Sequence, residues 1–162
     1  MLALENVFQN VPQPLREEIT NLWRRENVLT QDEQINQRLN QVVYVVRDSV
    51  SGALVGVSTS EKKRVQALSN HYFYEFRCFI GNAHRVAGLD VKLSKLTFDF
   101  LESISKEDEN KPIGIFSILE NETLKQEPVW RRAVWPELSM YFVGYTNSGN
   151  PIRVYYFKGA RI

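Results

Sequence analysis

The first forty residues carry apolar positions at helical spacing. After Pro14 such positions recur three and four residues apart, which predicts an amphipathic helix over residues 14–26. A second, short helix through Ile35 and Leu39 is predicted to begin at Thr30. Thr30 and Glu33 form a capping-box pattern, in which each side chain bonds the backbone N–H of the other residue. The apolar stripe of the first helix consists of Leu15, Ile19, Leu22 and Trp23.

The pattern then changes to short β-branched and aromatic runs. Apolar runs at 42–46 and 53–57 flank a turn containing Gly52, so residues 41–60 are predicted to form a β-hairpin. The charged stretch Glu61–Arg64 is predicted to be a solvated loop, with a contact to phosphate as the alternative. Residues 71–80 are dense in aromatic side chains and predict a long, central strand.

The rest of the chain predicts one long helix followed by strands. Apolar positions at helical spacing indicate a helix over residues 89–105, after a turn at Gly81–Asp90. The remaining expected elements, in chain order, are a buried strand (Ile113–Leu119), an irregular segment (120–138) with a helical turn near Val129–Ala133, and a hairpin of Met140–Tyr145 with Ile152–Phe157.

Composition and charge limit the fold class more than the function. A chain of 162 residues with 43% hydrophobic and 24% charged residues can form one core that buries about two-thirds of its unfolded surface, so a single domain is predicted over residues 1–162. Twenty basic and nineteen acidic residues create no overall field for nucleic acid or an anionic membrane. No apolar run approaches the roughly 20 residues of a membrane span, and the single cysteine excludes an internal disulfide. A cytoplasmic protein is expected.

The turn before the long helix carries the most specific pattern. A helix N-terminus presents free N–H groups and a partial positive charge, and Gly88 allows close approach of the backbone, so this turn can hold a pyrophosphate. The turn resembles the acyl-CoA N-acyltransferase (GNAT) superfamily, whose motif is Arg or Gln, two variable residues, Gly, one variable residue, and Gly or Ala. Asp90 departs from the motif and is interpreted as the helix N-cap. The matching residues are Arg85, Val86, Ala87, Gly88, Leu89 and Asp90.

The order of the predicted elements extends this resemblance from about Pro14 to Tyr145. It implies an α/β fold with a mixed central sheet of about six to seven strands and flanking helices. It also implies acetyl-CoA as co-substrate, with its pyrophosphate against residues 85–90. The backbone of Cys78, Phe79 and Ile80 would bond the pantetheine and the thioester carbonyl, beside a parallel neighbour at 113–119. Asn121 matches a family position that often contacts the cofactor.

Two carboxylates are candidates for the general base that deprotonates an attacking amine. Glu75 lies on the predicted central strand, where the resembling enzymes sometimes carry this base. The alternatives are that Glu75 faces solvent or pairs with Arg77. Glu120 is a second candidate. The tyrosine with which the family often protonates the leaving thiolate has no evident counterpart after Asn121.

Other conspicuous residues have structural interpretations. Cys78 is interpreted as a small buried residue rather than a nucleophile. His71 and His84 do not have a metal-ligand spacing, so no metal site is predicted. A cluster of tryptophans and arginines has two interpretations. It packs in the core or in a subunit contact, or it forms a surface that binds a nucleic-acid base or an acidic partner. It consists of Trp130, Arg131, Arg132 and Trp135.

Two functions are compatible with the sequence. The first is an acetyl-CoA-dependent N-acetyltransferase that acts on an unidentified small-molecule or protein amine. The second is a catalytically inactive protein of the same fold that binds a protein or nucleic acid through residues 122–162, which carry six Lys or Arg and three Glu. The aromatic hairpin 140–157 either pairs across a homodimer or covers the core.

Overall fold

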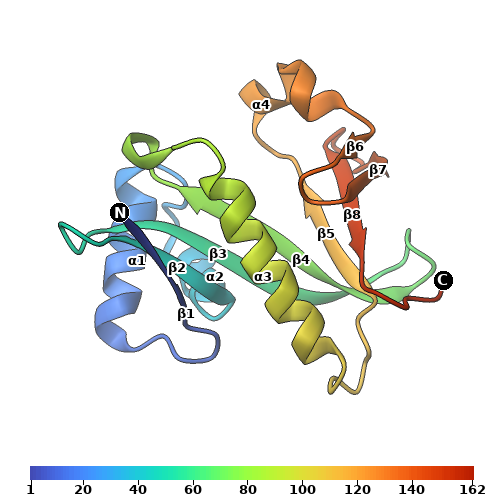
Figure 1. Ribbon diagram of the computed structural model, residues 1–162, viewed down its shortest axis with the longest axis horizontal. Coiled ribbons are helices and arrows are strands. Elements are labelled where there is room, and N and C mark those ends of the chain that lie inside the picture. Colours follow the sequence, from blue (N-terminus) through green and yellow to red (C-terminus); the bar gives the residue numbers. More distant parts are fainter. The chain divides into compact units, whose positions relative to one another are not determined.

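The computed structural model describes residues 1–162 and consists of helices and strands in the arrangement of Figure 1. The helices are α1 (Gln13–Arg25), α2 (Asp32–Leu39), α3 (Leu89–Ser105) and α4 (Glu122–Gln126), with 3-10 turns η1 (Asn82–His84) and η2 (Pro128–Arg131). The strands are β1 (Leu2–Asn6), β2 (Val42–Asp48), β3 (Leu54–Val65), β4 (His71–Ile80), β5 (Gly114–Ile118), β6 (Val134–Trp135), β7 (Met140–Tyr145) and β8 (Pro151–Tyr156).

The eight strands form one mixed sheet, which confirms the expected α/β class. Their order is β1-β2-β3-β4-β5-β8-β7-β6. The expected parallel pair is present, because Tyr74 and Glu75 of β4 lie opposite Ile115 and Phe116 of β5. The expected count of six to seven strands is exceeded, because β1 and the two-residue strand β6 were not predicted from the sequence.

The residues group into two compact units. The first contains Met1–Ser60 and Arg77–Thr97, and the second contains Glu61–Phe76 and Phe98–Ile162. β3, β4 and α3 each contribute residues to both units.

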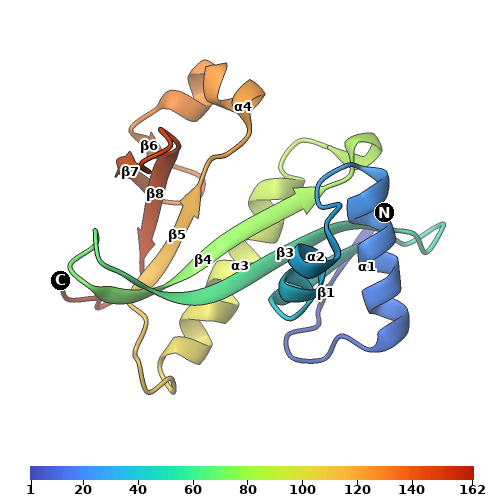
Figure 2. The ribbon, with the colours of Figure 1, turned by 180° about the vertical axis from the view of Figure 1, so that it is seen from behind.

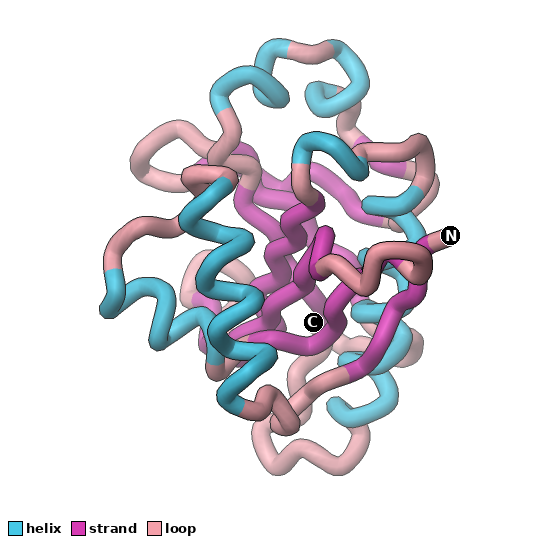
Figure 3. Tube along the Cα trace, turned by 90° about the vertical axis from the view of Figure 1, so that its left-hand side faces the viewer, coloured by secondary structure: helices cyan, strands magenta, loops and turns pink.

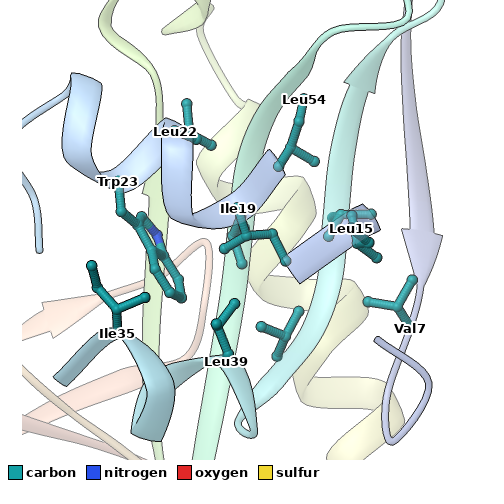
Figure 4. Packing of buried hydrophobic residues seen from close by; sticks show 11 residues of the cluster. Val7, Leu15, Ile19, Leu22, Trp23, Ile35, Leu39 and Leu54 are labelled. Atoms are coloured by element: carbon teal, nitrogen blue, oxygen red, sulfur yellow. The ribbon is translucent and has the colours of Figure 1, made fainter. Parts of the chain in front are cut away.

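The first unit has an apolar core on each face of its strands. Figures 1 and 2 show α1 and α2 on one face of β2 and β3, and the first turns of α3 on the opposite face. Figure 4 shows Ile19, Trp23 and Leu39 directed into the core beneath the first two helices. All four residues of the predicted stripe of α1 are buried, so burial of that stripe holds the helix on the sheet. The core on the α3 face consists of Val46, Val55, Ile80, Leu89 and Leu93.

The start of α1 agrees with its prediction from the sequence, whereas the start of α2 differs from its prediction. α1 begins within one residue of the predicted start, with Pro14 in its first turn. The predicted capping box is wrong, because α2 begins at Asp32 and no side chain caps it. Asp32 and Glu33 instead place two carboxylates in the first turn, where they interact favourably with the helix dipole.

Besides β6, the sequence did not predict β1 or the last residues of β3 as strand. Figure 3 shows the chain entering β1 directly after the N-terminus, where Leu2–Asn6 pairs antiparallel with β2. The predicted solvated loop at residues 61–64 is wrong, because these residues continue β3 as far as Val65. Their charged composition favours a loop, but strand preference depends on the structural context, and here these residues extend an existing strand.

The second unit builds its core around the C-terminal half of α3. One cluster joins this half-helix to strands β4, β5 and β7, and a smaller cluster contains Phe73, Phe116 and Val154. The predicted helical turn at 129–133 is displaced, because the structure has α4 followed by η2 at Pro128–Arg131. None of the helices combines the length and apolarity that crossing a membrane requires. The larger cluster consists of Tyr74, Phe76, Phe98, Leu101, Ile115, Met140 and Phe157.

Candidate functional site

The turn between β4 and α3 lies in the first unit and presents its backbone to solvent. Gly88 has φ of +81°, in the left-handed region that glycine adopts without a steric penalty, and nothing lies within 4 Å of the position that a Cβ would take there. Residues 85–88 are exposed, whereas Leu89 is buried in the core on the α3 face and fixes the start of the helix. The turn therefore combines a helix start that is anchored in the core with open space above its glycine.

Hydrogen bonds within the turn hold its shape. The Arg85 Nε–H donates to the carbonyl of Ile80 at 3.2 Å, which ties the arginine to the end of β4. The Leu89 N–H donates to the carbonyl of Val86 at 3.2 Å. The first N–H groups of a helix have no intrahelical acceptor; because the Leu89 N–H is bonded to Val86, the N–H groups that follow it in the first turn of α3 are the ones that an anion would contact.

Asp90 does not cap this helix. α3 begins at Leu89, so Asp90 is its second residue rather than the predicted N-cap, and its side chain is exposed. A carboxylate in the first helical turn is stabilised by the helix dipole. The same charge opposes a phosphate bound at the helix start, and the interaction amounts to about 1 kcal/mol at 4 Å in water.

The last residues of β4 direct their side chains into different environments. Phe79 packs against the core beneath α1 and α2, and Ile80 is buried on the α3 face. Cys78 is exposed, so the expectation that it is buried is wrong. Desolvation by the surrounding protein, assisted by the charge of Asp90, raises the pKa of the Cys78 thiol to about 12. The thiol is therefore protonated near neutral pH, as its interpretation as a non-nucleophile requires.

Glu75 lies in the second unit, where its buried carboxylate pairs with the partly exposed Lys63. Glu75 is 2% exposed, so the alternative that it faces solvent is wrong. Its Oε2 accepts a hydrogen bond from Nζ of Lys63, and the same Nζ lies 3.2 Å from Oε2 of Glu61. Desolvation lowers the pKa of Lys63, but the hydrogen bonds and charges of the two carboxylates outweigh it and raise that pKa.

Lys63 was not predicted as a site residue, because residues 61–64 were expected to form a loop. In a strand, alternate side chains point to the same face, so Glu61 and Lys63 share one face of β3.

Glu120 and Asn121 lie between β5 and α4, and both are exposed. The side-chain oxygen of Asn121 accepts a hydrogen bond from the Leu124 N–H at 3.0 Å, so Asn121 is the N-cap of α4. The cap orients the Asn121 amide and leaves Glu120 in the exposed segment before it.

The C-terminal tryptophans pack around an arginine that the sequence did not single out. Arg153 is 2% exposed, and its guanidinium lies 4.0 Å from the ring centroid of Trp135. It donates to the carbonyls of Trp130 at 2.8 Å and Ala133 at 3.3 Å. The rings of Trp130 and Trp135 meet edge to face at 4.9 Å. The two tryptophans are thus half-buried and support this internal cluster, while Arg131 and Arg132 are exposed.

The described residues contain no group of three His, Cys, Asp or Glu side chains that could hold a metal ion. Two features are therefore candidates for binding or catalysis. They are the exposed turn at Gly88, in the first unit, and the buried Glu75, in the second.

Comparison with solved structures identifies the fold. An arylalkylamine N-acetyltransferase-like protein from mosquito matches with a TM-score of 0.69 at 10% identity, over 97% of this chain and 100% of that one. A ribosomal-protein-S5-alanine acetyltransferase from Vibrio fischeri matches with a TM-score of 0.64 at 12% identity, over 99% and 96%. An aminoglycoside 6'-N-acetyltransferase complexed with coenzyme A matches with a TM-score of 0.60 at 14% identity, over 99% of each chain. No protein-family model and no curated protein matches the sequence. The chain has the GNAT fold.

Proposed function

We propose that this GNAT-fold chain is an acetyl-CoA-dependent N-acetyltransferase and that residues 1–162 form one N-acyltransferase domain. The observation that carries the proposal is the exposed Gly88 turn at the start of α3, in a fold shared with N-acetyltransferases. Coenzyme A carries a pyrophosphate, and an anion of this kind is stabilised by the free N–H groups and partial positive charge of a helix N-terminus.

The turn would hold the pyrophosphate through its backbone, and Arg85 would add a nearby positive charge. Gly88 leaves open the space that a side chain would otherwise fill. Before this turn, the backbone groups of Cys78, Phe79 and Ile80 would form hydrogen bonds with the pantetheine and the thioester carbonyl. Asn121, held by its capping bond to α4, is proposed to contact the same cofactor.

Glu75 is the proposed general base. It would accept a proton from the acceptor amine, whose lone pair then attacks the thioester carbon; the C–S bond breaks and coenzyme A leaves as a thiol after protonation. The buried position of Glu75 supports this role, because a carboxylate shielded from water is held in one orientation and interacts strongly with an incoming ammonium group. Glu120 remains the second candidate for this role.

The acceptor classes to test first come from the names of the structural neighbours: an arylalkylamine, an alanine-containing peptide of ribosomal protein S5, and an aminoglycoside. Release of coenzyme A from acetyl-CoA would be measured with each amine. The parent chain is expected to acetylate at least one class.

The Glu75→Gln variant tests the base with its shape retained. General-base catalysis contributes about 100-fold to 10,000-fold, so turnover at neutral pH should fall by that range while acetyl-CoA still binds. Glu61→Gln is the matched control, because Glu61 contacts the same lysine without being the proposed base. Unchanged turnover in Glu75→Gln, or an equal loss in both variants, would remove Glu75 from the mechanism.

A further inference from the structure

Lys63 differs from the other paired lysines of the second unit in the carboxylate that it contacts. Lys62 pairs with Asp108 at 2.9 Å, and Lys125 pairs with Glu122. Lys63 alone among these three places its Nζ on Glu75, the proposed base. Its side chain is 43% exposed, whereas Glu75 is almost completely buried. The structure thus shows a primary ammonium group, on a partly exposed side chain, in direct contact with the carboxylate that would deprotonate an acceptor.

A general base must lie within hydrogen-bond reach of the proton that it removes. Lys63 satisfies this condition through its hydrogen bond to Glu75 Oε2. Glu61 Oε2, 3.2 Å from the same Nζ, adds a second carboxylate that attracts a cation to this point. These two carboxylates hold the Lys63 Nζ within hydrogen-bond distance of the proposed base, which is the position that an acceptor amine requires.

We propose that Lys63 is a site of self-acetylation, modified in cis when acetyl-CoA is bound and no other acceptor amine is present. This inference rests on the proposed acetyltransferase function and adds to it a defined substrate within the chain itself.

The reaction is an acyl transfer with no change of oxidation state. Glu75 takes one proton from the Lys63 Nζ, and the lone pair that this exposes forms an N–C bond to the thioester carbonyl. The C–S bond breaks, and the leaving thiolate of coenzyme A takes up the second proton that the attacking nitrogen loses as the amide forms. Glu75 then releases the first proton to solvent. The products are Nε-acetyl-lysine at position 63 and coenzyme A. The acetylated nitrogen carries no positive charge, so its ion pairs with Glu61 and Glu75 are lost.

The experiment incubates the purified full chain with isotope-labelled acetyl-CoA and no amine. Intact mass and peptide mapping then follow the label, which distinguishes new acetylation from any acquired during expression. We expect one labelled acetyl group at Lys63, with little label at Lys62. Lys62 is the matched control, because it is adjacent in sequence and also paired with a carboxylate. The fraction labelled per unit time should not depend on protein concentration, as a reaction in cis requires.

Glu75→Gln separates catalysed from spontaneous acetylation, because the two respond in opposite directions. The ion pair with Glu75 raises the pKa of Lys63, so its loss leaves more free amine and accelerates spontaneous modification. Loss of the base instead slows catalysed modification by about 100-fold or more. Lys63→Arg retains the charge but cannot form acetyl-lysine, so it should remove the label while retaining coenzyme A binding.

Three results would overturn the proposal: labelling at Lys63 no greater than at Lys62, faster labelling in Glu75→Gln, or a labelling rate that rises with protein concentration. A parallel assay with external amines identifies which claim has failed. If the chain acetylates an external amine but never Lys63, only the self-acetylation is wrong. If it binds no acetyl-CoA, the acetyltransferase function and the self-acetylation are both wrong.

Discussion

Gly88→Val is the substitution that tests the coenzyme A turn most specifically. Nothing lies within 4 Å of a Cβ at this position, so the new side chain extends into open space, which is the space proposed for the pyrophosphate. Its cost to the fold comes from the backbone, because a left-handed φ costs an L-residue about 1–2 kcal/mol. In a chain of this size each kcal/mol lowers the melting temperature by about 2–4 °C.

Gly52→Val supplies a matched control. Gly52 has φ of +73° in the turn between β2 and β3, and nothing lies within 4 Å of its Cβ position either. Both variants should therefore lose a similar, small amount of stability. A hydrogen bond to a charged group contributes about 1.5–3 kcal/mol, so each hydrogen bond to the phosphate that Gly88→Val prevents should weaken binding about 10-fold to 100-fold.

Titration calorimetry with coenzyme A measures this difference directly, after circular dichroism has shown that both variants are folded. Gly52→Val should bind like the parent chain, and Gly88→Val should bind much more weakly. Parent-like binding by Gly88→Val would refute the placement of the pyrophosphate. An equal loss of affinity in both variants would show that backbone strain, rather than the space above Gly88, explains the effect.

Three further predictions concern single positions. Asp90→Asn should tighten coenzyme A binding by several-fold at low salt, and the gain measured by calorimetry should shrink as salt screens the charge. Cys78 should react with iodoacetamide at pH 8 more slowly than a free cysteine, and the rate should rise with pH, because the raised pKa of its thiol leaves little thiolate at pH 8. Gly114→Ala should lower stability to urea by about 1–3 kcal/mol or more, because its Cβ would lie 2.3 Å from the carbonyl oxygen of Tyr155.

The elements with strong apolar periodicity could be predicted from the sequence. α3 has the predicted bounds of Leu89 and Ser105, and α1 differs by one residue at each end. In both cases a continuous apolar stripe predicts the helix, and a Pro or Gly near its start predicts where it begins. The Gly88 turn was identified for a related reason, because glycine between a strand and a helix has a specific conformational role.

The features that depend on contacts between distant segments could not be predicted. The ion pair of Lys63 with Glu75 depends on which residues of β3 and β4 lie opposite each other. The charges along each strand do not reveal this register. Arg153 in a strand has the appearance of a surface residue, and only the carbonyls of Trp130 and Ala133 explain its burial. Thr30 shows the reverse case, in which a valid local capping pattern is not used because α2 begins two residues later.

The most direct test of the central claim is the melting temperature of the parent chain as a function of acetyl-CoA concentration. A ligand that binds only the folded state stabilises it by mass action, by about 2.7 kcal/mol at 100 times its dissociation constant. The acetyltransferase account predicts a melting temperature that rises steadily with acetyl-CoA and rises far less in Gly88→Val. A melting temperature that stays constant up to millimolar acetyl-CoA would contradict it.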